Sequence, residues 1–269
     1  HIVDHDLKNA THHPAGDDVT QRLAQFRNVP AQTAEHLHVL EGVLYLHLHH
    51  AVDEVLIAGT LCAGEEQLHR LSAFRQMKTA VLRHERDKRR SVGAGTVLDA
   101  ALRDYGLRER EMEYHMGENG KPYFKYHKEL YFSLSHSGDY AICSIGGREM
   151  GNDIEMVRSG KQRVADRFFT EEERLWIDAA GSGEEADERI FRIWTVKESF
   201  MKATGKGMSL PLDDFSVQME AEHGRIRIRQ TVEAKYFHVR EYRNIDGYCV
   251  SVCCKESRNL GEELIPVIL

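Results

Sequence analysis

The segment "WTVKESFMKATGKG" (Trp194–Gly207) combines the apolar pattern of a buried helix with charged residues. Aromatic and aliphatic side chains such as Phe200 favour a protein interior, and their spacing predicts a helix with one apolar side. Lys197, Glu198 and Lys202 interrupt that pattern. Either these charges face water, or they face a charged ligand.

Helical spacing places two of these three charges on the same side of the helix. Residues four apart lie on the same side of a helix, so Trp194, Glu198 and Lys202 form one stripe. A carboxylate beside an ammonium group suits phosphoryl chemistry, in which the carboxylate holds a metal ion and the ammonium neutralises phosphate oxygens. The same two residues also suit an exposed ion pair worth ~0.5 kcal/mol. The helix pattern by itself is compatible with both interpretations.

Composition and charge limit the class of protein. A chain of 269 residues that is 41% hydrophobic and 29% charged is typical of a soluble protein with one large domain or two coupled lobes. It contains no run of ~20 apolar residues that would span a bilayer, and the start "HIVDHDLKNATHH" lacks a signal-peptide pattern. We therefore expect a cytoplasmic protein without a membrane partner. The net charge of −7 argues against a nucleic-acid partner.

Two groups of metal-ligating residue types have simpler interpretations. Residues 1–41 are rich in histidine, and we interpret them as an N-terminal extension of unassigned role rather than a metal-binding tract. The five cysteines contain no Cys-x-x-Cys pair, which favours buried reduced thiols over a metal or disulfide site.

The remaining chain alternates helical and strand-like patterns in two parts, which predicts an α+β fold with two similar lobes. The first lobe, residues 42–150, begins with a strand-like run and continues with helical patterns up to Gly106. After a turn at "GENGKP", two strand-like halves flank residues 135–139 in "YFSLSHSGDYAICSI".

The second lobe, residues 151–269, has its own start and stop signals. Thr170 and Glu173 form a T-x-x-E capping box, so a helix is predicted to begin there. The segment at 194–207 adds a second helix. Four strand patterns follow it: "DFSVQM", "RIRIRQ", "KYFHVREY" and "YCVSVCC".

The short stretch "GNDIE" is the strongest sign of a metal site. In a strand, Asp153 and Glu155 point to one face and Ile154 to the other. Two carboxylates on one face repel each other unless a cation lies between them, and Mg²⁺ favours a few carboxylates together with water and phosphate oxygens. Two exposed acids on an edge strand remain the alternative.

Other polar residues suit contact with an anion. Lys121 lies in the turn before "FSLSHSG", where small hydroxyls, His136 and a glycine follow an apolar strand. The stretch Arg83–Arg90, followed by Ser91, is strongly basic. His136 also fits an ordinary buried histidine, and basic runs are usually solvated helix faces.

Taken together, "GKP", "FSLSHSG", "GNDIE", "RFFTEEE" and "WTVKESFMKATGKGMSLPL" resemble, in order and spacing, the motifs of 4′-phosphopantetheinyl transferases of the Sfp type. The resemblance covers about Val43 to Cys254. It implies a pseudo-twofold protein of two α+β lobes with coenzyme A in the cleft between them. It also implies transfer of the phosphopantetheine arm to a serine of an apo acyl or peptidyl carrier protein, with release of adenosine 3′,5′-bisphosphate. We expect a monomer.

The resemblance also implies roles for individual residues. Asp153, Glu155 and Glu198 match the Mg²⁺ ligands, and Glu198 also matches the general base or the group that orients a water. Lys202 would neutralise the pyrophosphate as its bond breaks. The positions that match the nucleotide end are Lys121, Ser135 and His136, and those that match other phosphate contacts are Arg75, Lys78, Arg90 and Ser91.

Two positions depart from the family pattern. Ser133 stands where asparagine is usual, and Asn152 stands where an apolar residue is usual. We expect both to affect strand packing rather than chemistry. Two other functions use the same residues: a catalytically idle protein that binds coenzyme A or the carrier, and a Mg²⁺-dependent phosphodiesterase.

Overall fold

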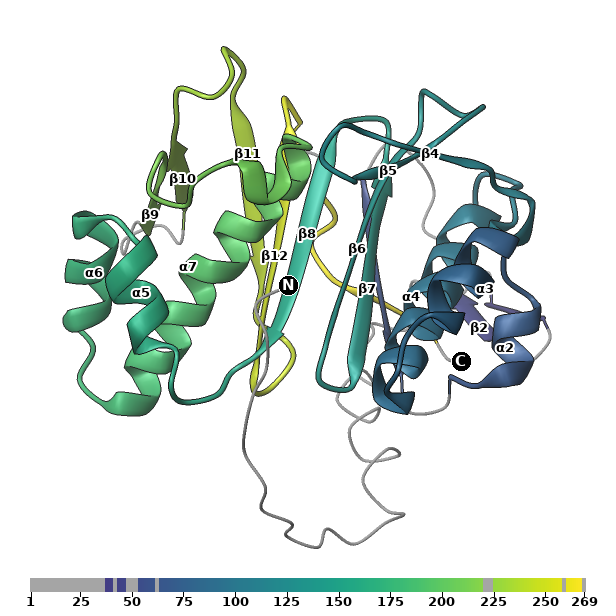
Figure 1. The fold of residues 1–269 in the computed structure, drawn as a ribbon, viewed down its shortest axis with the longest axis horizontal. Coiled ribbons are helices and arrows are strands. Elements are labelled where there is room, and N and C mark those ends of the chain that lie inside the picture. The colour runs from purple at the N-terminus through teal and green to yellow at the C-terminus, as the bar shows by residue number, and fades with distance from the viewer. Residues whose placement is uncertain are drawn as a thin grey trace, which may run out of the picture. The chain divides into compact units, whose positions relative to one another are not determined.

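Two β-sheets, each covered by one long helix, make up most of the protein (Figure 1). This computed structural model describes residues 37–40 and 43–46 by their backbone, and residues 53–60, 63–219, 225–257 and 260–267 in full. Most of the histidine-rich extension, the end of the strand pattern at 43–50, and Cys62 lie outside the described residues. All described residues belong to one compact unit, residues 37–269.

The first sheet has the strand order β13-β3-β7-β6. Its strands are β3 (Glu54–Gly59), β6 (Tyr131–Ser137), β7 (Tyr140–Gly146) and β13 (Ile265–Val267). All neighbours are antiparallel except β13, which runs parallel to β3. Helix α4 (Glu85–Arg103) covers this sheet and buries residues such as Val97 and Leu98 against it.

The second sheet has the order β11-β12-β8 and is antiparallel throughout. Its strands are β8 (Met150–Met156), β11 (Phe237–Tyr242) and β12 (Tyr248–Lys255). Helix α7 (Gly183–Ala203) lies across β8 and β12 (Figure 1). Gly151 permits the close approach, because a Cβ atom there would lie 2.0 Å from the carbonyl oxygen of Ser199.

Smaller elements surround the two sheets. Two helices, α5 (Gln162–Phe168) and α6 (Glu171–Asp178), pack against α7, and α3 (Ala73–Ala80) packs against α4. The others are β1 (Leu37–Leu40), β2 (Val43–Leu46), α2 (Glu65–His69), η3 (Glu109–Glu111), β4 (Tyr114–Met116), β5 (Pro122–Phe124), η4 (Gly207–Ser209), β9 (Ser216–Met219) and β10 (Ile226–Arg229).

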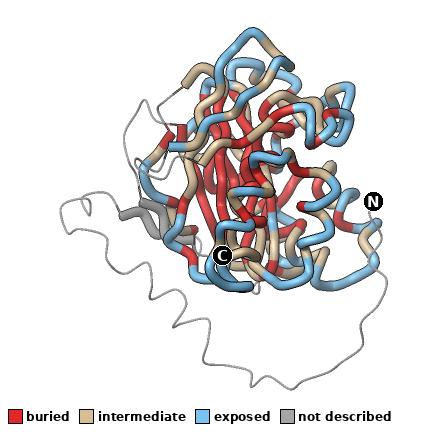
Figure 2. The backbone as a smooth tube through the Cα atoms, turned by 90° about the vertical axis from the view of Figure 1, so that its left-hand side faces the viewer, coloured by how far each residue is buried: buried red, intermediate tan, exposed pale blue. Residues whose placement is uncertain are grey.

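The buried residues concentrate in the strands and in the helix faces that cover them (Figure 2). Every residue of β7 is buried, as expected for a central strand with covered faces. Four cysteines are described, and all are free and buried, which confirms the prediction of reduced thiols for them. Among the helices that the structure describes, none is long and apolar enough to cross a membrane.

Several local predictions are confirmed. Thr170 caps α6, and the carboxylate of Glu173 accepts the Thr170 N–H in return. The "GENGKP" turn joins β4 to β5, with Gly120 at φ +83°. Strand β3 was missed because the run "EVLIAG" is short and apolar without alternation, a pattern that strands and buried helices share.

The C-terminal strand of the chain lies in the first sheet. The last strand, β13, pairs with β3 of the first sheet, and Leu260 forms a bridge with Asp53. The end of the chain therefore returns to the sheet built mainly from residues 54–146. The division into lobes at 42–150 and 151–269 remains a prediction.

The prediction for the side chain of Lys197 is wrong. The sequence grouped it with Glu198 and Lys202 as a charge that avoids the interior, but its side chain is fully buried. Helical geometry explains the difference, because Lys197 lies off the stripe formed by Trp194, Glu198 and Lys202. Those three residues are each partly exposed, whereas the residues between them are buried.

Candidate functional site

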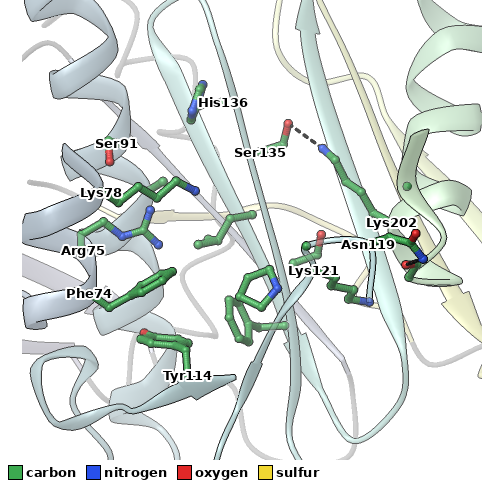
Figure 3. A pocket seen from close by; sticks show the side chains of 18 of the residues that line it. Phe74, Arg75, Lys78, Ser91, Tyr114, Asn119, Lys121, Ser135, His136 and Lys202 are labelled. Carbon is green, nitrogen blue, oxygen red and sulfur yellow. Dashed lines mark hydrogen bonds between the residues drawn. The ribbon is translucent and has the colours of Figure 1, made fainter. Parts of the chain in front are cut away.

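A pocket of about 510 Å³ contains most of the residues predicted to contact a coenzyme (Figure 3). Its walls come from α3, α4, the β4–β5 turn, β6 and the end of α7. The predicted residues that line it are Arg75, Lys78, Ser91, Lys121, Ser135, His136 and Lys202. The pocket thus brings together residues that are far apart in the sequence.

One wall of the pocket carries two basic side chains, Arg75 and Lys78. Arg75 is 4% exposed, and its Nε atom is buried without a hydrogen-bond partner among the described residues. Burial, and then the charge of Arg75, lower the pKa of Lys78 on the same helix. A buried guanidinium nitrogen without an acceptor is costly unless an anion binds there. This wall therefore suits an anionic ligand.

A glycine in α4 leaves room for the side chain of Arg75 between α3 and α4. This glycine is Gly95, and a Cβ atom at that position would lie 3.1 Å from Cγ of Arg75. Ser91 and Thr79 join α4 to α3 through a hydroxyl–hydroxyl hydrogen bond of 2.8 Å. Ser91 therefore serves the packing of these helices as well as the pocket wall.

Two further basic residues face the pocket (Figure 3). Lys121 donates a 2.9 Å hydrogen bond to the carbonyl oxygen of Met150, and burial lowers its pKa to about 8. Desolvation, followed by the charges of Arg90 and Lys202, lowers the pKa of His136. His136 is therefore neutral near pH 7, and a bound anion would favour its protonation.

Lys202 joins the pocket to the carboxylates of β8. Its Nζ donates to Asp153 Oδ1 at 2.8 Å, to the carbonyl oxygen of Asn152 at 2.9 Å and to Ser135 Oγ at 3.2 Å. These contacts use all three donors of the ammonium group. In this arrangement Lys202 neutralises Asp153.

The three carboxylates predicted to bind a metal lie close enough to affect one another. Burial and the charges of Asp153 and Glu155 raise the pKa of Glu198, against the opposing charge of Lys202. Burial and Asp153 raise the pKa of Glu155. Like charges in reach of one another disfavour ionisation. The three carboxylates therefore form a cluster whose negative charge Lys202 offsets only in part.

This cluster is not arranged as a finished metal site. Among the described residues, no set of three or more His, Cys, Asp or Glu side chains has the geometry to hold a metal ion. Lys202 occupies Oδ1 of Asp153, whereas Oδ2 is buried and has no hydrogen-bond partner in the described part of the chain. The assignment of Asp153, Glu155 and Glu198 as ligands remains a prediction.

The two departures from the family pattern form one hydrogen-bonded pair. Asn152 is fully buried, and its backbone N–H donates to Ser133 Oγ at 3.0 Å. Its side-chain amide donates to the Ser133 carbonyl at 2.8 Å and to Ser144 Oγ at 3.1 Å. These contacts join β6, β7 and β8 and agree with the expected role in strand packing.

Arg90 lies outside the pocket lining. Its Nε donates to the carbonyl oxygen of Gly138 in the β6–β7 turn at 3.0 Å, and its Nη1 lies 3.4 Å from Asp87 Oδ1. Gly138 has φ +55°, and a Cβ atom there would clash with the hydroxyl of Tyr248. Arg90 therefore holds a tightly packed turn.

The pocket also has an aromatic part that the sequence did not predict. Phe74 and Tyr114 line it, with ring centroids 4.8 Å apart. Glu109, which is fully buried, accepts a 2.9 Å hydrogen bond from the Tyr114 hydroxyl. No sequence pattern connects these residues, because folding of the β4–β5 hairpin onto α3 brings them together.

The fold and the site define an α+β protein with a basic pocket next to a carboxylate cluster. Residues 149–253 match the family described as "4'-phosphopantetheinyl transferase superfamily". The "4'-phosphopantetheinyl transferase" of Bacillus subtilis is 33% identical over 196 residues, which cover 72% of this chain and 87% of that protein. The chain belongs to the 4′-phosphopantetheinyl transferase superfamily, which confirms the resemblance seen in the motifs.

Two further proteins are similar to this chain. The "4'-phosphopantetheinyl transferase Sfp" of Bacillus subtilis strain 168 is 32% identical over 171 residues, covering 63% of this chain and 75% of that protein. A solved holo-(acyl-carrier-protein) synthase from Bacillus anthracis str. Ames, in complex with CoA (3',5'-ADP), has 21% sequence identity and a TM-score of 0.36. The similarity covers 40% of this chain and 96% of that one.

Proposed function

We propose that this protein transfers the 4′-phosphopantetheine arm of coenzyme A to a serine of an apo acyl or peptidyl carrier protein. The serine oxygen forms a bond to the phosphorus that bears the pantetheine arm, and the bond from this phosphorus to the bridging oxygen breaks. The bonding electron pair leaves with adenosine 3′,5′-bisphosphate. The serine proton passes to Glu198, or to a water that Glu198 orients.

The observation that carries the proposal is the buried Nε of Arg75, which lacks an acceptor and lies in one pocket with Lys78, Lys121 and Lys202. Coenzyme A carries phosphates at two places, a 3′-phosphate and a pyrophosphate. A pocket with several cations suits such a ligand, because charge-assisted hydrogen bonds to phosphate are strong. Phe74 and Tyr114 add apolar contact area for its uncharged parts.

The three carboxylates have the donor chemistry that a divalent cation requires, although in the described residues they do not converge on one point. Mg²⁺ prefers oxygen ligands, and the buried Oδ2 of Asp153 is an oxygen without a partner among the described residues. Asp153, Glu155 and Glu198 would hold the ion, and a bound Mg²⁺ would stabilise charge on the phosphate oxygens. Its presence would also relieve the mutual repulsion that raises the pKa values of Glu155 and Glu198.

The basic and polar residues of the pocket would have separate roles in the reaction. Lys202 would bind the pyrophosphate and stabilise charge that grows on the leaving group. Lys121, Ser135 and His136 would contact the nucleotide end, and Arg75, Lys78 and Ser91 the other phosphates. Arg90 would act from outside the pocket by holding the β6–β7 turn.

We further propose the two-lobe arrangement that the family resemblance implies, with coenzyme A between the lobes. The arrangement of one sheet under α4 and one under α7 supports it. The pocket is lined from both sides, by α3 and α4 and by Met201 and Lys202 of α7. A cytoplasmic monomer remains our expectation.

The decisive experiment is incubation with coenzyme A, Mg²⁺ and an apo carrier protein, followed by intact-mass measurement of the carrier. A mass gain of one phosphopantetheine group supports the proposal, and a carrier with its acceptor serine replaced by alanine is the control. Hydrolysis of coenzyme A without modification of the carrier would instead indicate the phosphodiesterase. Binding of coenzyme A without either reaction would indicate the idle binding protein.

A further inference from the structure

Three serines of β6 make hydrogen bonds to β8, and each has a different partner. Ser133 bonds with Asn152, Ser135 donates to Asp153 Oδ1 at 2.8 Å, and Ser137 donates to Glu155 Oε2 at 2.8 Å. The three alternate along the strand, so they lie on the same face of β6. Strand β6 pairs with β7 in the first sheet and β8 pairs with β12 in the second, so these side chains supply contacts between the two sheets.

The direction of the hydrogen bond from Ser137 is fixed. A hydroxyl group has one proton to donate and can accept through its lone pairs. The backbone N–H of Met156 can only donate, and it reaches Ser137 Oγ at 3.1 Å. The proton of Ser137 is therefore directed to the carboxylate of Glu155. The serine thus ties this carboxylate to the backbone of the next residue in the same strand.

Ser137 differs from the other two serines in the side chains that it contacts. In the described part of the chain Ser133 bonds with Asn152 and with no carboxylate, and Ser135 is shared between Asp153 and the ammonium of Lys202. Among the contacts of the described residues, Glu155 has one side-chain hydrogen bond, the one from Ser137. Without it, the long side chain of Glu155 would be free to change rotamer.

We propose that Ser137 is a positioning residue that holds Glu155 ready to bind a divalent cation. The inference rests on the proposed function, in which Glu155 is a metal ligand. Groups that hydrogen-bond a ligating carboxylate orient it, and their loss typically weakens metal affinity by about 10–100-fold. In this proposal Ser137 acts through Glu155, to which it donates its hydroxyl proton.

Binding of Mn²⁺ tests this inference without turnover. Mn²⁺ is titrated into the protein in the presence of coenzyme A and the absence of carrier protein, and free Mn²⁺ is measured by electron paramagnetic resonance. Ser137→Ala is expected to weaken Mn²⁺ binding by about 10–100-fold. Ser137→Thr retains the hydroxyl on a β-branched residue that suits a strand, and it is expected to bind nearly as the wild type does.

Ser133→Ala is the matched control. It removes a hydroxyl from the same face of the same strand, and this hydroxyl also accepts an N–H of β8. The control is expected to lower the melting temperature while leaving Mn²⁺ affinity unchanged. Circular dichroism of each variant verifies that it is folded before the titration.

Three results would overturn the inference: unchanged affinity in folded Ser137→Ala, equal loss in Ser137→Ala and Ser137→Thr, or equal loss in Ser133→Ala. A wild type that binds no Mn²⁺ under these conditions would overturn it as well. The carrier-mass assay separates this failure from failure of the proposed function. Phosphopantetheine transfer by the wild type would stand even if Ser137 proved irrelevant to the metal.

Discussion

The Nζ atom of Lys197 lies 2.7 Å from Oε1 of Glu173, and neither side chain is exposed to solvent. Nζ also donates to the carbonyl oxygens of Leu212 and Phe215 at 2.7 and 2.8 Å. The carboxylate of Glu173 accepts the backbone N–H groups of Thr170 and Val217. One buried ion pair therefore connects α6, α7, β9 and the segment between α7 and β9, directly beside Glu198.

Removal of one partner of this ion pair should strongly destabilise the protein. Lys197→Met would leave the Glu173 carboxylate buried without its cation, at a cost of about 3–5 kcal/mol in the free energy of unfolding. Urea denaturation followed by circular dichroism measures this quantity. The double variant Lys197→Met/Glu173→Gln should recover part of the loss, because it removes the isolated charge.

The control for this prediction is the solvent-exposed pair of Lys88 and Glu85, whose nitrogen and oxygen are 2.6 Å apart. Lys88→Met should change the urea midpoint little, since exposed ion pairs contribute little to stability. If Lys197→Met were as stable as this control, the buried pair would not support α7 as described.

Glu198→Gln should lower kcat by about 10²–10⁴-fold, because the variant lacks both a metal ligand and the proposed base. We expect little change in the KM for coenzyme A. The pKa of Glu198 is raised in the folded state, so the native protein binds more protons than the unfolded chain and ionisation of Glu198 reduces stability as pH rises. The glutamine variant should therefore melt no lower than the wild type near pH 7. A large fall in melting temperature with normal activity of the folded fraction would mean that Glu198 is structural.

Lys202→Ala should damage both constants, raising the KM for coenzyme A and lowering kcat. An ammonium beside the pyrophosphate binds the ground state and also stabilises charge on the leaving group. Steady-state kinetics at varied coenzyme A separates the two effects. Lys206→Ala is the control, since Lys206 lies just beyond α7 and does not line the pocket. An unchanged KM in Lys202→Ala would contradict the proposed contact.

The pH dependence of kcat/KM for coenzyme A should report the ionisation of Lys121. Its pKa is about 8, so in the free protein it loses its proton as pH rises through this value. Only the protonated form attracts phosphate, and kcat/KM for coenzyme A reports the ionisation of the free enzyme. We expect kcat/KM to fall above pH of about 8 in the wild type. In Lys121→Arg, whose guanidinium remains protonated, the fall should move to higher pH. The same alkaline limb in the wild type and in Lys121→Arg would assign the ionisation to another group.

Gly151→Ala should separate α7 from β8. The added Cβ would lie 2.0 Å from the Ser199 carbonyl oxygen and 2.4 Å from the Ala203 nitrogen, both of which are backbone atoms that cannot rotate away. We expect a fall in melting temperature together with lower activity of the folded fraction, because α7 carries Glu198 and Lys202. Gly147→Ala is the control, as nothing lies within 4 Å of its Cβ position. Equal melting temperatures for the two variants would show that the helix adjusts at little cost.

Sequence periodicity predicted the elements that carry the site and the direction of several side chains. The alternation in "GNDIE" buries Ile154 and places Asp153 near Glu155, whose pKa the charge of Asp153 helps to raise after burial. The capping box of Thr170 and Glu173 forms as expected. These features depend on residues that are neighbours along one element, so local geometry is sufficient to predict them.

Tertiary structure decided which charges are buried and which share a pocket. Lys197 and Glu198 are adjacent in sequence, yet one is enclosed by Glu173 and two carbonyl groups while the other faces the carboxylate cluster. The sequence determined the stripe of Trp194, Glu198 and Lys202, because helical spacing is a property of the chain itself. It could not determine the burial of Lys197, because the acceptors that compensate its charge come from distant segments and meet only when the chain folds.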